Sequence, residues 1–76
     1  MEPIDVIAYS GGTGDERPKA FILRGFRIDV AEIVDRWIEE GSGDRMRKRC
    51  FRVMGSDGNM HTIYYDETGL EWYYSS

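Results

Sequence analysis

Two turn signals near the end of the chain constrain the fold more than any other feature. Ser56-Asp57-Gly58-Asn59 and Asp66-Glu67-Thr68-Gly69 both combine Asp with Gly, residues that form tight turns. The segments around them are rich in aromatic and β-branched residues, which favour strands. The sequence therefore predicts a three-stranded antiparallel meander over residues 47–74.

The first turn predicts the register of the first strand pair. A three-residue loop with Gly58 in the left-handed conformation pairs Phe51 with Ile63 and Val53 with His61. These side chains then share one face, which we expect to form the core. The outer face carries Arg52, Cys50, Thr62, Tyr64, Tyr73 and Arg49 or its neighbours.

The second turn predicts the register of the last strand in the same way. A four-residue loop over 66–69 pairs Tyr65 with Leu70, Ile63 with Trp72 and His61 with Tyr74. Both turns then place the large apolar side chains on the same face of the sheet.

A hairpin is predicted over residues 19–28, where apolar residues alternate around Arg24-Gly25. This turn pairs Leu23 with Phe26 and Phe21 with Ile28, and we expect all four side chains to point to the core. The next segment, 30–40, is ambiguous. Its apolar residues recur at helical spacing between an Asp cap and a Gly stop, which predicts a helix, but β-branched residues dominate it.

The predicted fold class is therefore α+β and β-rich. A small antiparallel sheet, made of the hairpin 19–28 and the meander 47–74, packs against one helix over 30–40. The alternative is a small all-β barrel in which 26–38 forms one long bent strand with a bulge.

The length of 76 residues predicts a single domain over 1–76, with a flexible loop at 10–18 where glycines cluster. Acids and Pro18 follow these glycines, so a phosphate-binding loop is not indicated. The start of the chain lacks the basic region of a secretory signal, and its apolar runs are too short for a membrane span. With Cys50 as the one cysteine, we expect a cytoplasmic protein that binds no membrane.

Charge is unevenly distributed along the chain. Five of the ten basic residues lie between Arg45 and Arg52, a segment of charge +5, while the remainder holds five basic and fourteen acidic residues, a net of −9. Cationic groups beside flat tyrosines suit a single-stranded nucleic acid or an acidic protein. The candidate contact residues are Arg45, Arg47, Lys48, Arg49, Arg52, Tyr64 and Tyr73. The alternative is that these cations pair with the acids of 30–40 and only solubilise the sheet.

His61 and Cys50 are the remaining candidates for chemistry. His61 lacks companion ligands at metal-binding spacing, so no metal or cofactor is predicted and a hydrogen-bonded histidine is expected. Cys50 lies next to Arg49 and near Arg52, which could lower the pKa of its thiol, although most lone cysteines are packing residues. We therefore predict that the protein is not an enzyme.

A resemblance adds to this interpretation. The chain from Arg17 to Tyr74 resembles a group of small uncharacterised bacterial domains, some of them appended to translesion-polymerase-like proteins. The residues that carry it are Phe21, Gly25-Phe26-Arg27, Val30, Ile33, Trp37, Phe51-Arg52-Val53, Asp57-Gly58, Ile63, Tyr65-Asp66 and Trp72. The resemblance implies a bacterial cytoplasmic accessory module near DNA metabolism, and it carries over no catalytic residue.

Two functional hypotheses follow from these observations. In the first, the domain is a non-enzymatic binding module that contacts nucleic acid or an acidic protein through the basic strand 45–52. In the second, it is a structural protein-interaction or homodimerisation domain without a nucleic-acid role, present as a monomer or a weak homodimer.

Overall fold

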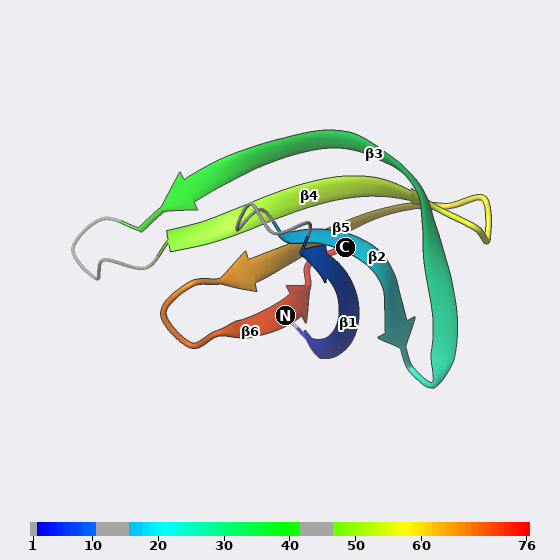
Figure 1. Cartoon of the computed structure of the whole chain (residues 1–76), viewed down its shortest axis with the longest axis horizontal. Coiled ribbons are helices and arrows are strands. Elements are labelled where there is room, and N and C mark those ends of the chain that lie inside the picture. Colours follow the sequence, from blue (N-terminus) through cyan, green and yellow to red (C-terminus); the bar gives the residue numbers. More distant parts are fainter. Residues whose placement is uncertain (1, 11–15, 42–46) are drawn as a thin grey trace.

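The computed structural model describes residues 2–10, 16–41 and 47–76 (Figure 1). Its described part consists of six strands and contains no helix. The strands are β1 (Glu2–Ser10), β2 (Glu16–Leu23), β3 (Phe26–Glu40), β4 (Arg47–Gly55), β5 (Met60–Asp66) and β6 (Glu71–Tyr74).

The strands follow one another around a closed antiparallel barrel in chain order. The pairing of Glu2, Pro3 and Ile4 with Tyr74, Tyr73 and Trp72 closes it between β1 and β6. Both ends of the described chain therefore lie at this seam. The long strand β3 arches over the molecule above β4, with β1 and β2 below it (Figure 1).

The predicted helix over 30–40 is wrong, and with it the α+β class. The segment belongs to the 15-residue strand β3, which confirms the alternative of a long bent strand in an all-β barrel. Its pairing with β4 shifts register between Val30 and Glu32 and again between Ile33 and Asp35. Each bulge inserts one extra residue into the strand, where side chains otherwise alternate between the two faces. Val30 and Ile33 therefore share a face although they are three positions apart, a spacing that is typical of a helix.

The predicted hairpin is confirmed in its pairing, with Leu23 opposite Phe26 and Phe21 opposite Ile28. Arg24 and Gly25 have φ angles of 51° and 84°, as a tight two-residue turn requires. Phe26, however, is 74% exposed, so the prediction that it points to the core is wrong. Phe26 directly follows the Arg24-Gly25 turn, at the tip of the hairpin.

The meander is confirmed over 47–74, and the register of β4 with β5 is the predicted one. The register of β5 with β6 is wrong by two residues, because Tyr65 pairs with Trp72 and Ile63 with Tyr74. The turn runs one residue further than predicted at its end: Leu70 has a φ of 57°, and its amide donates to the Asp66 carbonyl at 2.8 Å. A shift of two leaves every side chain on its predicted face.

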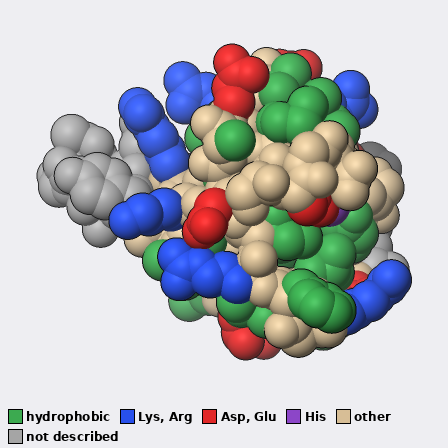
Figure 2. Space-filling model, turned by 90° about the vertical axis from the view of Figure 1, so that its right-hand side faces the viewer, with side chains coloured by type: hydrophobic (Ala, Val, Ile, Leu, Met, Phe, Trp, Pro, Cys, Tyr) green, Lys and Arg blue, Asp and Glu red, His purple; other side chains and the backbone are tan. Residues whose placement is uncertain are grey.

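The core lies inside the barrel and draws on β2 to β5. Its buried members are Phe21, Ile28, Phe51, Val53 and Ile63, and partly buried residues that include Trp72 and Tyr74 pack against them. Figure 2 shows the end of the molecule where β3 bends: hydrophobic side chains lie between Lys and Arg side chains spread around its margin.

The predicted flexible loop 10–18 falls mainly outside the described residues. Residues 11–15 are not described, while Ser10 and the segment from Glu16 belong to strands. The predicted first strand of the meander begins at Arg47 in the described chain, and Arg45 lies outside it.

A candidate interaction site beside the third strand

Two arginines of the basic strand β4, Arg47 and Arg49, are paired with acids within the molecule. Glu67, which follows β5, lies 2.9 Å from Arg47 Nε through Oε2 and 3.1 Å from Arg49 Nε through Oε1. Glu67 Oε1 accepts a hydrogen bond from Arg49. Glu67 Oε2 makes no hydrogen bond, so its contact with Arg47 is an ion pair only. Arg47 also lies 3.9 Å from Glu40. The acids that neutralise this strand therefore come from both of its neighbours.

The outer face of β4 carries a second packed layer rather than an open platform. The register places Trp37, Cys50, Tyr64 and Tyr73 in one row across β3, β4, β5 and β6. Tyr64 and Tyr73 stack with centroids 5.2 Å apart, and Lys48 Nζ lies 4.9 Å from the centroid of Tyr64. Tyr64 is only 6% exposed, so this candidate contact residue presents little surface to a partner.

Polar groups on this outer layer are paired with one another. Glu39 Oε2 accepts from Trp37 Nε1 at 2.8 Å and from the Cys50 thiol at 3.6 Å. The Trp37 bond, followed by the Cys50 bond, holds the pKa of Glu39 below its usual value. Tyr73 donates to Glu71 at 2.9 Å, which raises the pKa of its phenol. The carboxylates on this face thus accept hydrogen bonds from its aromatic and thiol groups.

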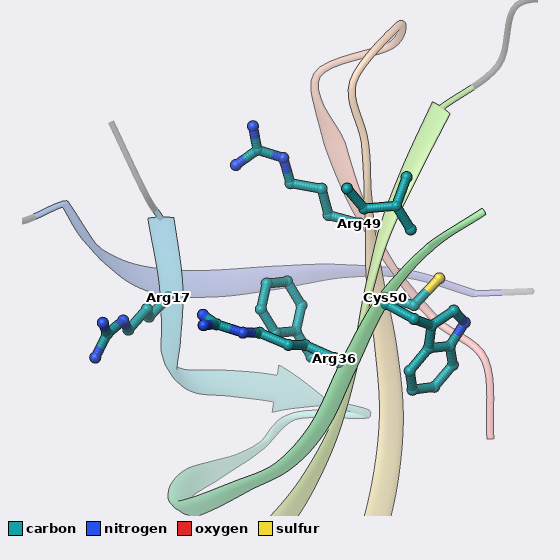
Figure 3. A pocket seen from close by; sticks show the side chains of 7 residues that line it. Arg17, Arg36, Arg49 and Cys50 are labelled. Carbon is teal, nitrogen blue, oxygen red and sulfur yellow. The ribbon is translucent and has the colours of Figure 1, made fainter. Parts of the chain in front are cut away.

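Cys50 is buried, which agrees with the packing residue favoured by the sequence and not with the alternative of a lowered thiol pKa. Burial, followed by the charge of Glu39, raises the pKa of Cys50 to about 11. The adjacent Arg49 does not reverse this, because Arg49 and Cys50 point to opposite sides of β4 (Figure 3). The thiol is a packing group.

His61 is buried in a hydrogen-bonded network, as expected. Its Nδ1 lies 3.0 Å from Tyr74 Oη, and its Nε2 lies 3.0 Å from Asp57 Oδ2 in the β4–β5 turn. Gly55 makes room for this arrangement, because a Cβ there would lie 2.7 Å from Ile28 Cγ2. Among the described residues, no group of His, Cys, Asp and Glu could hold a metal ion. The network ties the turn to the core.

Within the described residues, the edge of β3 that faces β2 is open along most of its length. Pairing with β2 ends at Asp29, and from Val30 to Glu40 the strand pairs with β4 alone among the residues described. Beyond the second bulge the run from Asp35 to Glu40 is regular. The Arg36 amide donates to the Asp35 carboxylate at 2.8 Å, so a side chain of the same strand already accepts from it. Val34 and Ile38 are 46% and 51% exposed beside this edge.

Two pockets lie along the open edge, and Arg17 from β2 and Arg36 from β3 line both. One has a volume of about 470 Å³ and is also lined by Arg49, Ile38 and Phe51. The other, of about 390 Å³, is lined further by Ile33, Val34 and Asp35. In Figure 3, Arg36 reaches toward Arg17, and Arg49 projects from the same side of the strands. Three cations therefore surround an apolar floor.

These arginines differ in their ion pairs. Arg49 is paired with Glu67, but within the described residues no carboxylate lies within 4.0 Å of the guanidinium group of Arg17 or Arg36. Arg52 likewise has no ion pair in the described part of the chain, where it pairs in register with Asp35 and Thr62. Among the described residues, the guanidinium groups of Arg17 and Arg36 thus line the two pockets without an ion pair.

Sequence reasoning missed Arg17 and Arg36. Of the predicted contact residues, only Arg49 lines the larger pocket, and Arg45 lies outside the described chain. The signal that identifies Arg36 is structural: once two bulges are allowed in β3, Arg36 stands opposite the buried Phe51 on the inward face.

These features define a class of protein, a small antiparallel barrel with one long strand that is partly unpaired, and with no metal cluster, among the residues described. More particularly, residues 1–73 match the domain of unknown function DUF6504, and the chain belongs to this family. No curated protein and no solved structure matches the chain. No described helix is long and apolar enough to cross a membrane.

Proposed function

We propose that this domain is a non-enzymatic protein-interaction module that binds an extended segment of a partner protein along the open edge of β3. The observation that carries the proposal is the run from Asp35 to Glu40, which pairs on one side only. Unpaired strand edges offer a row of backbone donors and acceptors to another chain, and many peptide-binding domains use them in this way.

The surroundings of the edge support a peptide as its occupant. The two pockets provide space for alternate side chains of an added strand, and exposed Val34 and Ile38 supply apolar contact beside it. A nucleic-acid role for β4 has weaker support, because Arg47 and Arg49 share Glu67 and the net charge of −4 repels a polyanion at a distance.

The test is a selection from a random peptide library on the immobilised full chain, followed by amide chemical shifts measured with the selected peptides. We expect the largest shifts, and slower amide exchange, over residues 35–40. Methylating the peptide amides that face β3 should abolish binding, because it removes the donors of the added strand. Methylating the alternate amides serves as the matched control.

Two results would overturn the proposal. One is a set of selected peptides whose shifts cluster away from β3. The other is a concentration-dependent dimer, seen by sedimentation, in which the β3 amides become protected without any peptide. In that case the partner of the edge is a second copy of the chain.

A further inference from the structure

The arginine pair beside the open edge has a chemistry of its own. Arg17 and Arg36 carry like charges and line the same two pockets, and within the described chain their guanidinium groups have no carboxylate within 4.0 Å. Like charges brought together repel one another, so an anion between them relieves the repulsion and gains charge-assisted hydrogen bonds. Planar guanidinium groups suit a carboxylate particularly well, because they donate in a forked geometry.

The walls of the larger pocket restrict what this anion can be. Ile38 and Phe51 line it alongside the arginines, so its ligand has an apolar part next to the charge. Asp35, Glu39 and Glu40 lie along the same strand and repel a chain that carries a charge on every unit. A single carboxylate on a peptide with apolar neighbours meets both conditions, whereas a nucleic-acid backbone does not.

We infer that the pocket between β2 and β3 selects an acidic side chain of the docked peptide, held by Arg17 and Arg36, with an apolar neighbour on Ile38 and Phe51. This inference rests on the proposed function, because β3 must hold the peptide backbone for the side chain to reach the pocket. It makes the domain a reader of extended segments in which an acidic residue lies two positions from a β-branched or other apolar residue, because alternate side chains of a strand share one face.

The experiment measures the affinity of a fluorescently labelled library-selected peptide for the full chain and for three variants. Arg36→Gln and Arg17→Gln should each weaken binding about tenfold, as expected for the loss of a charge-assisted contact. Arg27→Gln is the matched control, an arginine on the same strand that is exposed and pairs with Asp29 at 3.1 Å. It should change affinity less than twofold, and thermal melts should show that all variants fold.

Replacing the acidic residue of the peptide by Gln should also weaken binding about tenfold, and Arg36→Gln should then add little further loss, because the two groups act as a pair. If the peptide shifts the β3 amide resonances but its affinity responds neither to the Gln replacement in the peptide nor to Arg36→Gln, the selectivity inference fails and the proposed function stands. If no peptide shifts β3, both fail. If a single-stranded oligothymidine displaces the peptide in an Arg36-dependent way, the pocket is a phosphate site and the inference is overturned.

Discussion

The two sides of the β3–β4 pair use charged side chains in opposite ways. On the outer side, Glu39 and Lys48 cover a row of aromatic and thiol groups and are held by contacts within the molecule. On the side that faces β2, Arg17 and Arg36 line a pocket, and no described carboxylate lies within 4.0 Å of their guanidinium groups. The comparison shows that a cluster of cations in the sequence does not by itself indicate a binding surface, because acids that lie close in the fold can pair with each cation.

The largest effect is expected at the floor shared by the groove and the core. Phe51 is 5% exposed and packs against Trp72 with ring centroids 5.7 Å apart. Phe51→Ala should lower the free energy of unfolding by about 3 to 5 kcal/mol, because it removes a buried ring and leaves a cavity. Urea denaturation measures this, and a loss under about 1 kcal/mol would show that the groove side is not supported by the core.

The next largest effect concerns the closed outer side. With a pKa of about 11 against an ordinary 9.0, the Cys50 thiol should react with iodoacetamide about a hundredfold more slowly at pH 8 than in the urea-unfolded chain. The pKa of Cys50 is higher in the folded chain than in the unfolded chain. The thiol therefore contributes to folding stability below pH 9, and this contribution is lost as the pH rises through about 11. Equal rates in the folded and unfolded chains would mean that the outer layer is open.

A smaller effect is expected at the acid that neutralises β4. Glu67→Gln removes the charge shared by Arg47 and Arg49, which are 49% and 36% exposed, so the cost in unfolding free energy should be about 1 kcal/mol. The variant should also bind single-stranded DNA at low salt more tightly than the parent chain. If affinity for DNA does not change, neutralisation by Glu67 is not what limits the basic strand.

The smallest effect on stability should come from the groove itself. Arg36 is exposed and lacks an ion pair within the described residues, so Arg36→Gln should change the free energy of unfolding by less than about 0.5 kcal/mol. A clear loss in thermal melts would reveal an acid that neutralises Arg36 in solution.

How far the sequence predicts this molecule depends on the range of the forces involved. The Arg24-Gly25 and Gly58 turns are decided locally, so the hairpin and the β4–β5 register could be predicted. The conformation of 30–40 could not, because its bulges exist only in the presence of β4, and they turn a strand pattern into one with helical spacing. The turn after Asp66 misled the register because a non-glycine residue, Leu70, adopts a left-handed conformation.

The candidate site shows the same division. The basic segment 45–52 is conspicuous in the sequence, but Glu67, which neutralises it, is brought in by the meander. Arg17 and Arg36 stand apart among unremarkable neighbours in the sequence, and only the arch of β3 over β2 makes them line one groove. Contacts between distant strands, which no local pattern reports, decide both outcomes.

The seam between β1 and β6 has a mechanical consequence. The antiparallel pairing of Glu2 with Tyr74 and Ile4 with Trp72 places both chain ends at the same end of one ladder. Tension applied through the two ends would therefore break the residue pairs between β1 and β6 one after another, instead of loading all of them at once. Stretched in this direction, the domain should yield at low force from the seam inward, and the β3–β4 pair should separate last.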